Sequence, residues 1–210
     1  KTMSFETGAC LGIPGLTAAQ CTLGDGSLKG KTILISGGAG SVGNLSIQLA
    51  KWSGARVIAT GSSTGFDRIK NAGADYVFGY SDPQLEQKIL DISPSGIDRV
   101  IEVEFGNNIN LFPKIMKPYS VLSVYGSAKN MVPILPFGQY LYKGIKISIE
   151  LIYILPELPR LRAIKNLHDA HFDKALKTGI DTIYDLSECA IAHDKSLTPG
   201  RAGAILLSTN

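Results

Sequence analysis

TILISGGAGSVG, at residues 32–43, is the stretch of sequence that decides the fold. Its first part is a short run of apolar and β-branched residues, which is typical of a buried strand. Its second part fits the pattern G-x-G-x-x-G over 38–43. Apolar residues at helical spacing follow from Asn44 to about Ser53, and Gly54 marks the end of that helix. A strand, a glycine loop and a helix in this order predict a loop that binds a dinucleotide.

Each glycine of the pattern has its own predicted role. Gly38 allows the tight turn, Gly40 lets the backbone approach a pyrophosphate, and Gly43 lets the helix pack closely on the strand. The start of the helix then offers unpaired N–H groups and a partial positive charge to the phosphates. A P-loop of the Walker A type is excluded, because no Lys-Ser or Lys-Thr pair follows the glycines. The alternative is a glycine-rich connector that binds nothing.

Strands and helices alternate along most of the chain. Further hydrophobic runs predict strands at 55–60, 75–78, 98–103, 119–125 and 144–151, and helices at 66–72, 84–92 and 111–116. The alternation loosens later, with a loop near Pro133 and Pro136, a helix from Pro156 or Pro159 to about Lys177, a strand at 182–184, a helix at 187–196, a turn at Pro199-Gly200 and a strand at 204–207. Nearly continuous hydrophobic strands are typical of a parallel sheet covered on both faces. The sequence therefore predicts an α/β fold with a doubly wound parallel sheet of the Rossmann type.

Composition excludes several classes of protein. The chain has 210 residues, of which 44% are hydrophobic and 19% charged, so it is long and apolar enough for a folded core. A net charge of +3 and the lack of a long apolar run argue against nucleic-acid and membrane partners. Cys10, Cys21 and Cys189 form no CxxC pair, so neither a disulfide framework nor a zinc site is expected. Unpaired thiols favour a reducing cytoplasm.

The end of the second strand bears on the choice between NAD and NADP. NAD-binding domains usually carry Asp or Glu there to hold the ribose hydroxyl, but this chain has Thr60-Gly61-Ser62-Ser63-Thr64. The first carboxylate is Asp67, in the next helix, and Arg68 follows it. Hydroxyl groups without a carboxylate favour NADP(H), whose 2′-phosphate they can hydrogen-bond. The alternative is that the serines only cap the next helix.

Two other patterns in the sequence are candidates for a catalytic site and a metal site. Tyr125 and Lys129 fit Y-x-x-x-K, the catalytic pair of short-chain dehydrogenases, but Gly126 follows the tyrosine and Pro133 prevents a long helix. The three histidines, His168, His171 and His193, are too scattered to indicate a metal site.

Several segments together resemble one protein family. They are Gly30 to Ser36 running into GGAGSVGNLSIQLAK, Ala72 to Tyr80, Ile101-Glu102 with Asn107 to Leu111, Ala192 to Asp194, and Gly200 to Leu207. They resemble the medium-chain dehydrogenase/reductase superfamily, and most of all its zinc-free quinone oxidoreductase branch, which includes zeta-crystallin. The resemblance implies NADPH binding and the reduction of quinones or α,β-unsaturated carbonyls. Hydride would pass directly to the substrate, so no catalytic side chain is expected.

The resemblance also implies where the cofactor lies. Ala39 to Val42 would cradle the pyrophosphate, Gly61 to Ser63 would face the 2′-phosphate, and Tyr80 would flank the adenosine. Asn108 and the turn from Val124 to Ser127 would lie along the ribose and nicotinamide. The cofactor-binding residues expected in all are Gly38, Ala39, Gly40, Ser41, Val42, Gly43, Gly61, Ser62, Ser63, Tyr80, Asn108, Val124, Tyr125, Gly126 and Ser127. Many relatives have a lysine where this chain has Gly65.

The resemblance finally implies how the chain is divided. Relatives begin with a β-rich catalytic domain, whereas the glycine loop here begins at Gly38. The expected parts are a remnant of the interdomain linker helix at 1–29, a dinucleotide-binding domain at 30–180, and a return segment at 181–210 that would belong to a missing catalytic domain. A non-catalytic NADPH-binding module and an enoyl reductase remain alternatives. The strand at 144–151 predicts a homodimer joined at a sheet edge, unless the helix at 161–175 covers it.

Overall fold

A parallel sheet of six strands forms the centre of the molecule. The computed structural model describes residues 3–198 and 203–209. The strands are β1 (Thr32–Ile35), β2 (Arg56–Gly61), β3 (Tyr76–Gly79), β4 (Ile97–Glu102), β5 (Met116–Val124) and β6 (Lys146–Ile149). They lie in the order β3-β2-β1-β4-β5-β6, and each neighbouring pair is parallel. This order confirms the doubly wound Rossmann fold, with its switch point between β1 and β4.

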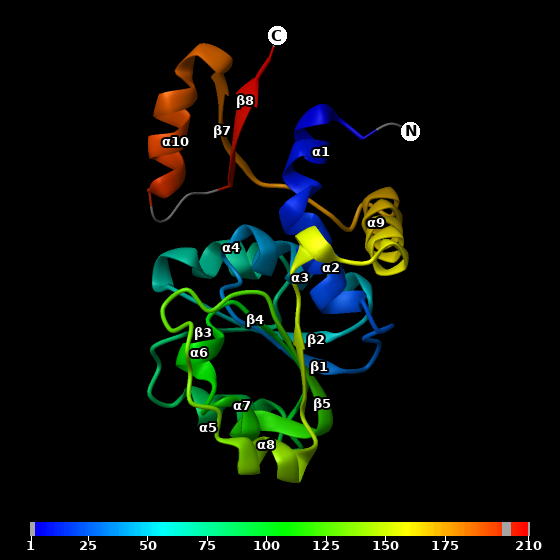
Figure 1. Ribbon diagram of the computed structural model, residues 1–210, viewed down its shortest axis with the longest axis vertical. Helices are drawn as coiled ribbons and strands as arrows, with labels where there is room; N and C mark the ends of the chain where they lie inside the picture. Colours follow the sequence, from blue (N-terminus) through cyan, green and yellow to red (C-terminus); the bar gives the residue numbers. More distant parts are fainter. Residues whose placement is uncertain (1–2, 199–202, 210) are drawn as a thin grey trace.

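Helices cover both faces of this sheet (Figure 1). One core contains buried residues of α2 (Ile13–Leu23), α3 (Ser41–Trp52), α4 (Phe66–Asn71) and α9 (Glu157–Phe172). The other contains buried residues of α5 (Leu85–Ile92), α7 (Phe112–Ile115) and α8 (Phe137–Lys143). Successive residues of β1 point to opposite cores, Ile33 and Ile35 to the first and Leu34 to the second. Burial of both faces explains why the strands are hydrophobic throughout.

A second, smaller sheet lies beyond α3 and α4 at one end of the molecule (Figure 1). It contains β7 (Ile180–Asp185) and β8 (Ala204–Ser208), which are parallel and are joined through η3 (Leu186–Glu188) and α10 (Cys189–Leu197). The N-terminal helix α1 (Phe5–Leu11) contacts β8. The predicted strands at 182–184 and 204–207 are therefore confirmed with longer bounds. The predicted turn at Pro199-Gly200 lies outside the described residues, and the division at residue 180 stays a prediction.

The long helix α9 ends at Phe172, five residues before the predicted end at Lys177. Lys174 adopts a left-handed conformation with φ of 60°, and the Ala175 amide donates to the Ala170 carbonyl at 2.8 Å. This is a helix-ending turn in which a lysine takes the place that glycine usually has. The prediction relied on Gly179 as the stop signal and was therefore wrong by more than one turn.

Other elements also differ from the prediction. The strand predicted at 119–125 begins at Met116, because a bulge at Tyr119, with φ of 56°, lets the chain rejoin the sheet after a shift in register. The helix predicted at 111–116 is shortened to α7 in consequence. The predicted loop near Pro133 and Pro136 is present, and a helix that was not predicted, α8, follows it, with Pro136 as its N-cap residue. The predicted linker helix divides at Gly12 into α1 and α2.

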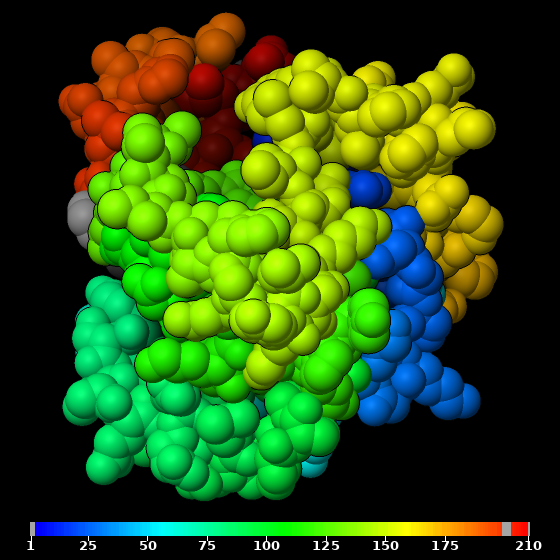
Figure 2. All heavy atoms as spheres, turned by 60° about the horizontal axis from the view of Figure 1, so that its bottom comes forward, coloured from blue at the N-terminus to red at the C-terminus, as the bar shows by residue number. Residues whose placement is uncertain are grey.

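The segment between β5 and α9 forms one face of the molecule (Figure 2, yellow-green). Its short elements are α8, β6 and η2 (Ile152–Ile154). The exposed large apolar side chains on this segment are Met131, Val132, Ile134, Leu135, Phe137, Leu141, Tyr142, Ile149, Leu151, Tyr153 and Ile154. Strand β6 has one sheet edge without a partner, because it is the last strand of the sheet. Within residues 3–198 and 203–209, no helix has both the length and the apolar character needed to cross a bilayer.

Candidate cofactor site

The glycine loop joins β1 to α3 at the edge of the sheet where the strands end. Gly37 takes a left-handed conformation with φ of 68°, and the Gly40 amide donates to the Gly37 carbonyl at 2.9 Å, which closes the turn. Gly40 and Ser41 are exposed, and α3 begins at Ser41 without a side-chain hydrogen bond from its N-cap. The first N–H groups of this helix therefore remain available to an anion from outside.

Two glycines hold the loop in close contact with its neighbours. A Cβ atom on Gly43 would lie 2.3 Å from the Gly37 carbonyl oxygen. A Cβ atom on Gly65 would lie 2.6 Å from the Cβ atom of Ala39, so the turn after β2 packs directly on the glycine loop. A lysine at residue 65, as in many relatives, would require one of these turns to move.

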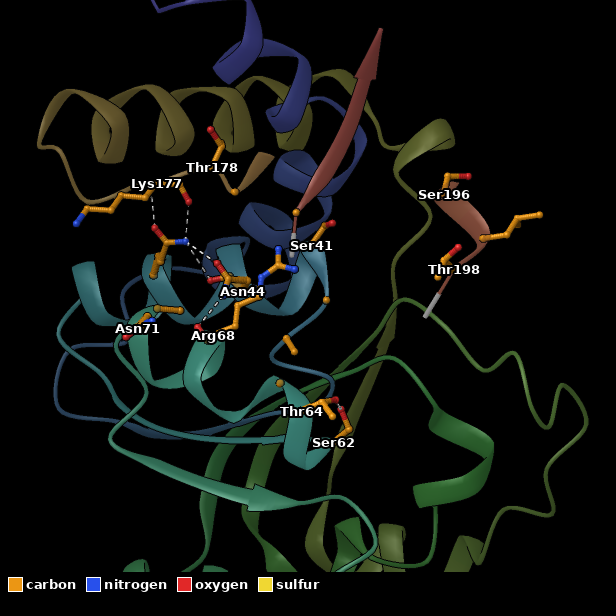
Figure 3. A pocket seen from close by; sticks show the side chains of 18 residues that line it. Ser41, Asn44, Ser62, Thr64, Arg68, Asn71, Lys177, Thr178, Ser196 and Thr198 are labelled. Atoms are coloured by element: carbon orange, nitrogen blue, oxygen red, sulfur yellow. Dashed lines mark hydrogen bonds between the residues drawn. The ribbon is translucent and has the colours of Figure 1, made fainter. Parts of the chain in front are cut away.

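A cavity of about 740 Å³ opens beside the loop, between α3, α4 and the C-terminal segment (Figure 3). Its lining residues are Ala39, Gly40, Ser41, Asn44, Gln48, Ser62, Thr64, Gly65, Arg68, Asn71, Ala72, Lys177, Thr178, Gly179, Ser196, Leu197, Thr198 and Gly203. Four of the predicted cofactor residues, Ala39, Gly40, Ser41 and Ser62, meet here. No Asp or Glu is among the lining residues in the described part of the chain.

The turn after β2 presents hydroxyl groups to this cavity. The Ser62 and Thr64 hydroxyl oxygens are 2.9 Å apart, and both side chains are exposed. The N-cap of α4 is Gly65, and no side chain caps that helix. The alternative interpretation of the serines as helix caps is therefore wrong. Gly61 is buried against Ile69 and Ser63 lies outside the cavity lining, so only Ser62 of this predicted group lines it.

Sequence reasoning missed the wall that the C-terminal segment supplies. Gln48 accepts a hydrogen bond from the Lys177 amide at 2.6 Å and donates to the Lys177 carbonyl at 3.1 Å. The same Gln48 amide donates to Asn44 Oδ1 at 2.9 Å. Residues 129 positions apart cannot be paired from local patterns. One signal was present: Asn44 and Gln48 are polar side chains four positions apart in a helix that is otherwise largely buried.

Asn108 lies after β4, in α6 (Phe105–Asn108), and the predicted turn from Val124 to Ser127 lies at the end of β5, both outside the cavity lining. Of the other predicted residues outside the lining, Gly38, Val42 and Gly43 belong to the glycine loop and the start of α3, and Tyr80 follows β3. Asn108 donates to Glu102 Oε1 at 3.1 Å. The Ser127 hydroxyl accepts from the Gly106 amide at 2.8 Å and donates to the Asn130 carbonyl. A Cβ atom on Gly126 would lie 2.5 Å from the Val103 carbonyl oxygen. Hydrogen bonds and close packing thus join the loop after β5 to the loop after β4, and the Asn108 and Ser127 side chains are engaged within them.

Tyr80 and Tyr125 have different surroundings. The Tyr80 amide donates to the Gly61 carbonyl at 3.2 Å, and Lys129 Nζ lies 6.0 Å from the centre of the Tyr80 ring. Tyr125 directly follows β5, and burial raises the pKa of its hydroxyl. Because Lys129 points to Tyr80 from a loop, the helical Y-x-x-x-K arrangement of short-chain dehydrogenases is not formed.

Glu102 belongs to a segment that carries the family resemblance, but the sequence indicates no role for it. Its side chain is fully buried at the end of β4, and its Oε1 atom also accepts a hydrogen bond from the Glu104 amide. Its Oε2 atom has no hydrogen-bond partner among the described residues. Burial raises the pKa of this carboxyl to about 7. The available signal was a carboxylate at the end of a strand that is otherwise largely apolar.

Metal binding is not supported by the residues present. In the parts of the chain that the structure describes, no three His, Cys, Asp or Glu side chains come together as ligands for a metal ion. His168 and His171 lie on α9, and His193 lies on α10.

Comparison with known proteins identifies the family. Residues 41–160 match the family model described as zinc-binding dehydrogenase, which covers more than half of the chain. The chain therefore belongs to the medium-chain dehydrogenase/reductase superfamily, of which these dehydrogenases are members. Curated relatives named quinone oxidoreductase are similar to this chain over most of its length, among them the quinone oxidoreductase of Rattus norvegicus at 26% identity over 99% of this chain and 64% of its own length.

Three of the similar proteins bear on the function. The chloroplast envelope quinone oxidoreductase homolog of Arabidopsis thaliana is 30% identical over 95% of this chain and 60% of its own length. The trans-enoyl reductase ACTTS2 of Alternaria alternata is 28% identical over 70% of this chain and 47% of its own length. A mycobacterial protein solved with NADPH superposes with a TM-score of 0.82 at 22% identity, over 98% of this chain and 65% of its own. The chain thus spans about 60% of the length of the first relative.

Proposed function

We propose that this chain binds NADP(H) and forms the cofactor-binding part of an oxidoreductase acting on quinones or α,β-unsaturated carbonyls. The observation that carries the proposal is the exposed first turn of α3 beside a large polar cavity that also reaches the end of β2. Gly40 carries no Cβ atom, and Gly40 and Ser41 are both exposed, so their backbone N–H groups would be accessible to a pyrophosphate. The family membership supports the same class of cofactor.

The preference for the phosphorylated nucleotide rests on the charges of the cavity. Its lining contains Arg68 and Lys177 and lacks a carboxylate among the described residues. The hydroxyl groups of Ser62 and Thr64 line the same cavity. An arrangement of hydroxyl groups and cations stabilises a 2′-phosphate, whereas NAD-binding sites place a carboxylate at this strand end.

The role of the protein in the reaction is positioning. When bound, the cofactor supplies the hydride or electrons, and the proposal assigns no side chain of this chain to the chemical step. Gly38 to Gly43 and Gly61 to Ser63 would orient the dinucleotide, and Tyr80 would lie at its adenosine end. Asn108 and the turn from Val124 to Ser127 would line its nicotinamide half, with the loop contacts described above keeping that wall fixed.

Substrate, compartment and assembly complete the proposal. The quinone oxidoreductase relative favours quinones, and the trans-enoyl reductase relative keeps the enoyl reductase as a second candidate. A cytoplasmic location is proposed from the three free cysteines. A homodimer joined through β6 is proposed from its unpaired edge, because α9 packs against α2 and leaves Ile149 exposed.

Binding of the two nicotinamide nucleotides tests the proposal. We expect NADPH to bind this chain at least about tenfold more tightly than NADH, measured by calorimetry at fixed ionic strength, since one charge-assisted contact contributes more than 1.4 kcal/mol. Ser62→Asp should reduce or invert the ratio, because a carboxylate repels the 2′-phosphate and can hold the ribose hydroxyl. Ser95→Asp, at an exposed turn on the opposite edge of the sheet, should leave the ratio unchanged.

Equal affinity for the two nucleotides would overturn the NADPH preference, and no heat with either would overturn the cofactor site itself. Oxidation of NADPH by a soluble quinone and by an α,β-unsaturated ketone, followed at 340 nm, then distinguishes the candidates. Tight binding without turnover of either acceptor supports the alternative of a non-catalytic NADPH-binding module.

A further inference from the structure

The side chain of Glu102 lies where the segments that follow β1 and β4 meet, and the switch point between these strands is the crevice in which a dinucleotide would bind. Ile101 is paired with Ile35 across β4 and β1, so the next residues, Glu102 and Ser36, begin the two loops side by side. The loops touch immediately beyond, since a Cβ atom on Gly37 would lie 3.0 Å from a Val103 methyl group. In a doubly wound sheet, this junction between neighbouring strands is the point where a dinucleotide crosses.

The Glu102 carboxyl group holds the loop after β4 in place. Its Oε1 atom accepts hydrogen bonds from the Glu104 amide at the start of this loop and from the Asn108 side chain at its end. The same loop is tied to the one after β5 through Phe105, whose amide donates to the Gly126 carbonyl at 3.1 Å. One carboxyl oxygen therefore fixes both ends of a segment that lines the proposed nicotinamide half of the crevice.

The surroundings of this carboxyl group supply no positive charge. The groups within its electrostatic reach are the hydroxyl of Ser36 from the end of β1, the phenols of Tyr125 after β5 and Tyr140 from α8, and the amides of its own loop. None of the ion pairs in the described part of the chain includes Glu102. The one arginine on β4, Arg99, donates instead to the Cys21 carbonyl and to Asp25.

Burial without a counter-charge favours the protonated carboxyl group. The contacts with the Glu104 amide, Asn108 and Ser36 act in the opposite direction, but burial is the larger effect and brings the pKa to about 7. Glu102 therefore changes its charge near neutral pH, while its Oε2 atom is fully buried and lacks a hydrogen-bond partner. A dinucleotide with a pyrophosphate and a 2′-phosphate would bring several more negative charges to the same crevice.

We propose that Glu102 is a positioning residue whose bound proton holds the loop after β4 in the form that accepts NADP(H), so that loss of this proton weakens cofactor binding. The inference rests on the proposed function, because it assumes that the crevice binds the dinucleotide. Linkage requires the reciprocal effect: cofactor that binds better to the protonated form must make the Glu102 proton harder to remove.

Cofactor affinity as a function of pH tests the inference. Dissociation constants for NADPH are measured by calorimetry from pH 6 to 8.5 for the wild type, Glu102→Gln and Glu104→Gln. Glutamine keeps an oxygen acceptor for the Glu104 amide and Asn108 but carries no titrating proton, so it imitates the protonated acid. We expect wild type and Glu104→Gln to lose affinity by up to about tenfold for each pH unit above 7, the limit for one linked proton, and Glu102→Gln to lose only the part due to the cofactor's own phosphate.

NMR of the wild type tests the same inference without relying on the behaviour of a variant. The carboxyl carbon of Glu102, observed by NMR after ¹³C labelling of glutamate, should titrate near neutral pH in the free chain and at a higher pH with saturating NADPH. Glu102→Gln identifies the resonance by its loss and serves only for assignment. A purely structural role for Glu102 would not move this midpoint.

The outcomes separate the inference from the proposed function. Identical pH profiles in wild type and Glu102→Gln, or a midpoint that NADPH lowers or leaves unchanged, would overturn the role of Glu102 while NADPH binding stands. Absence of NADPH binding in the wild type at every pH would overturn the proposed function and the inference together. Steeper loss of affinity in wild type, with an upward shift of the midpoint, supports both.

Discussion

At the scale of single residues, the candidate site depends on glycines, because a Cβ atom at such a position would clash with the neighbouring backbone. Gly43 has its Cα atom where the α3 helix meets the glycine loop, and an added Cβ would lie 2.9 Å from the Gly38 Cα atom as well as against the Gly37 carbonyl. Neither neighbour is a flexible side chain, so the contact cannot be relieved without moving the turn that presents Gly40 and Ser41. The close packing at Gly43 therefore also fixes the backbone that would bind a pyrophosphate.

Gly43→Ala tests this dependence. We expect the variant to lose about 1–3 kcal/mol of unfolding free energy through overpacking, and to bind NADPH at least about tenfold more weakly because the first turn of α3 shifts. Chemical denaturation and calorimetry measure the two quantities. The control is Gly138→Ala in α8, where an added Cβ meets nothing within 4 Å and the helix should gain up to about 1 kcal/mol. Normal NADPH binding by Gly43→Ala would contradict the argument.

The glycines of the loop could be predicted from the sequence, whereas the roles of Glu102 and Gln48 could not. The roles of Gly40 and Gly43 follow from a local pattern, because each depends on neighbours within one turn of the chain. Glu102 and Gln48 depend instead on burial and on partners that only the folded chain brings near, from the loop after β4 and from residue 177. The positive φ falls on Gly37, one residue before the predicted turn glycine Gly38, because the pattern does not specify which glycine takes it.

At the scale of elements, the C-terminal segment is attached to the phosphate-binding helix by a side chain. The Gln48 carboxamide accepts a hydrogen bond from the Lys177 amide and donates one to the Lys177 carbonyl. This pairing fixes residues 177–179, which precede β7 and line the cavity. The position of the small β7–β8 sheet relative to the cavity is thereby tied to α3.

Gln48→Ala should release this attachment. The Lys177 amide and carbonyl would lose their partners, and we expect a loss of roughly 2–3 kcal/mol in local stability for two buried hydrogen bonds. Hydrogen exchange should show loss of protection at the β7–β8 amides, with the six-stranded sheet still protected. Gln87→Ala, which removes an exposed bond to Asp91 on α5, is the matched control and should change stability by less than about 0.5 kcal/mol. Equal protection in both variants would show that Gln48 is not the attachment.

Element bounds failed where the stop signal was unusual. Lys174 ends α9 in a left-handed conformation that sequence patterns assign to glycine, and Tyr119 does the same in the bulge of β5. In the second case an added Cβ atom on Gly144 would lie 3.1 Å from the Tyr119 ring, but this tyrosine is 88% exposed, so side-chain packing does not explain its conformation. A left-handed residue other than glycine costs about 1–3 kcal/mol, and spacing in the sequence does not indicate where the chain adopts one.

At the scale of the whole molecule, the alternation of strands and helices was sufficient to predict the sheet and its class. Parallel strands must be joined by right-handed crossovers, which leaves few orders for six strands once the glycine loop marks β1. The order in the second half was harder to predict, since α8 and β6 follow a stretch with Pro133 and Pro136 that resembles a loop.

The edge strand β6 carries the last prediction, on assembly. Ile149 is 78% exposed on this strand, and the surrounding face has many exposed apolar side chains. An exposed apolar edge is usually paired or covered, so a second copy of β6 related by twofold symmetry would extend the sheet across a dimer. We expect sedimentation velocity to give about twice the chain mass of 22.4 kDa at micromolar concentration.

Ile149→Lys should weaken this dimer by at least about tenfold, because it places like charges opposite each other across the twofold axis. Ile183→Lys is the matched control: Ile183 is 50% exposed, but it lies on β7, away from this edge, so its substitution should leave the dimer intact. A wild type that stays monomeric at micromolar concentration would contradict the proposal of a dimer. A dimer that Ile149→Lys leaves unchanged would place the interface elsewhere, since the edge of β6 is the one surface where the added charges would meet.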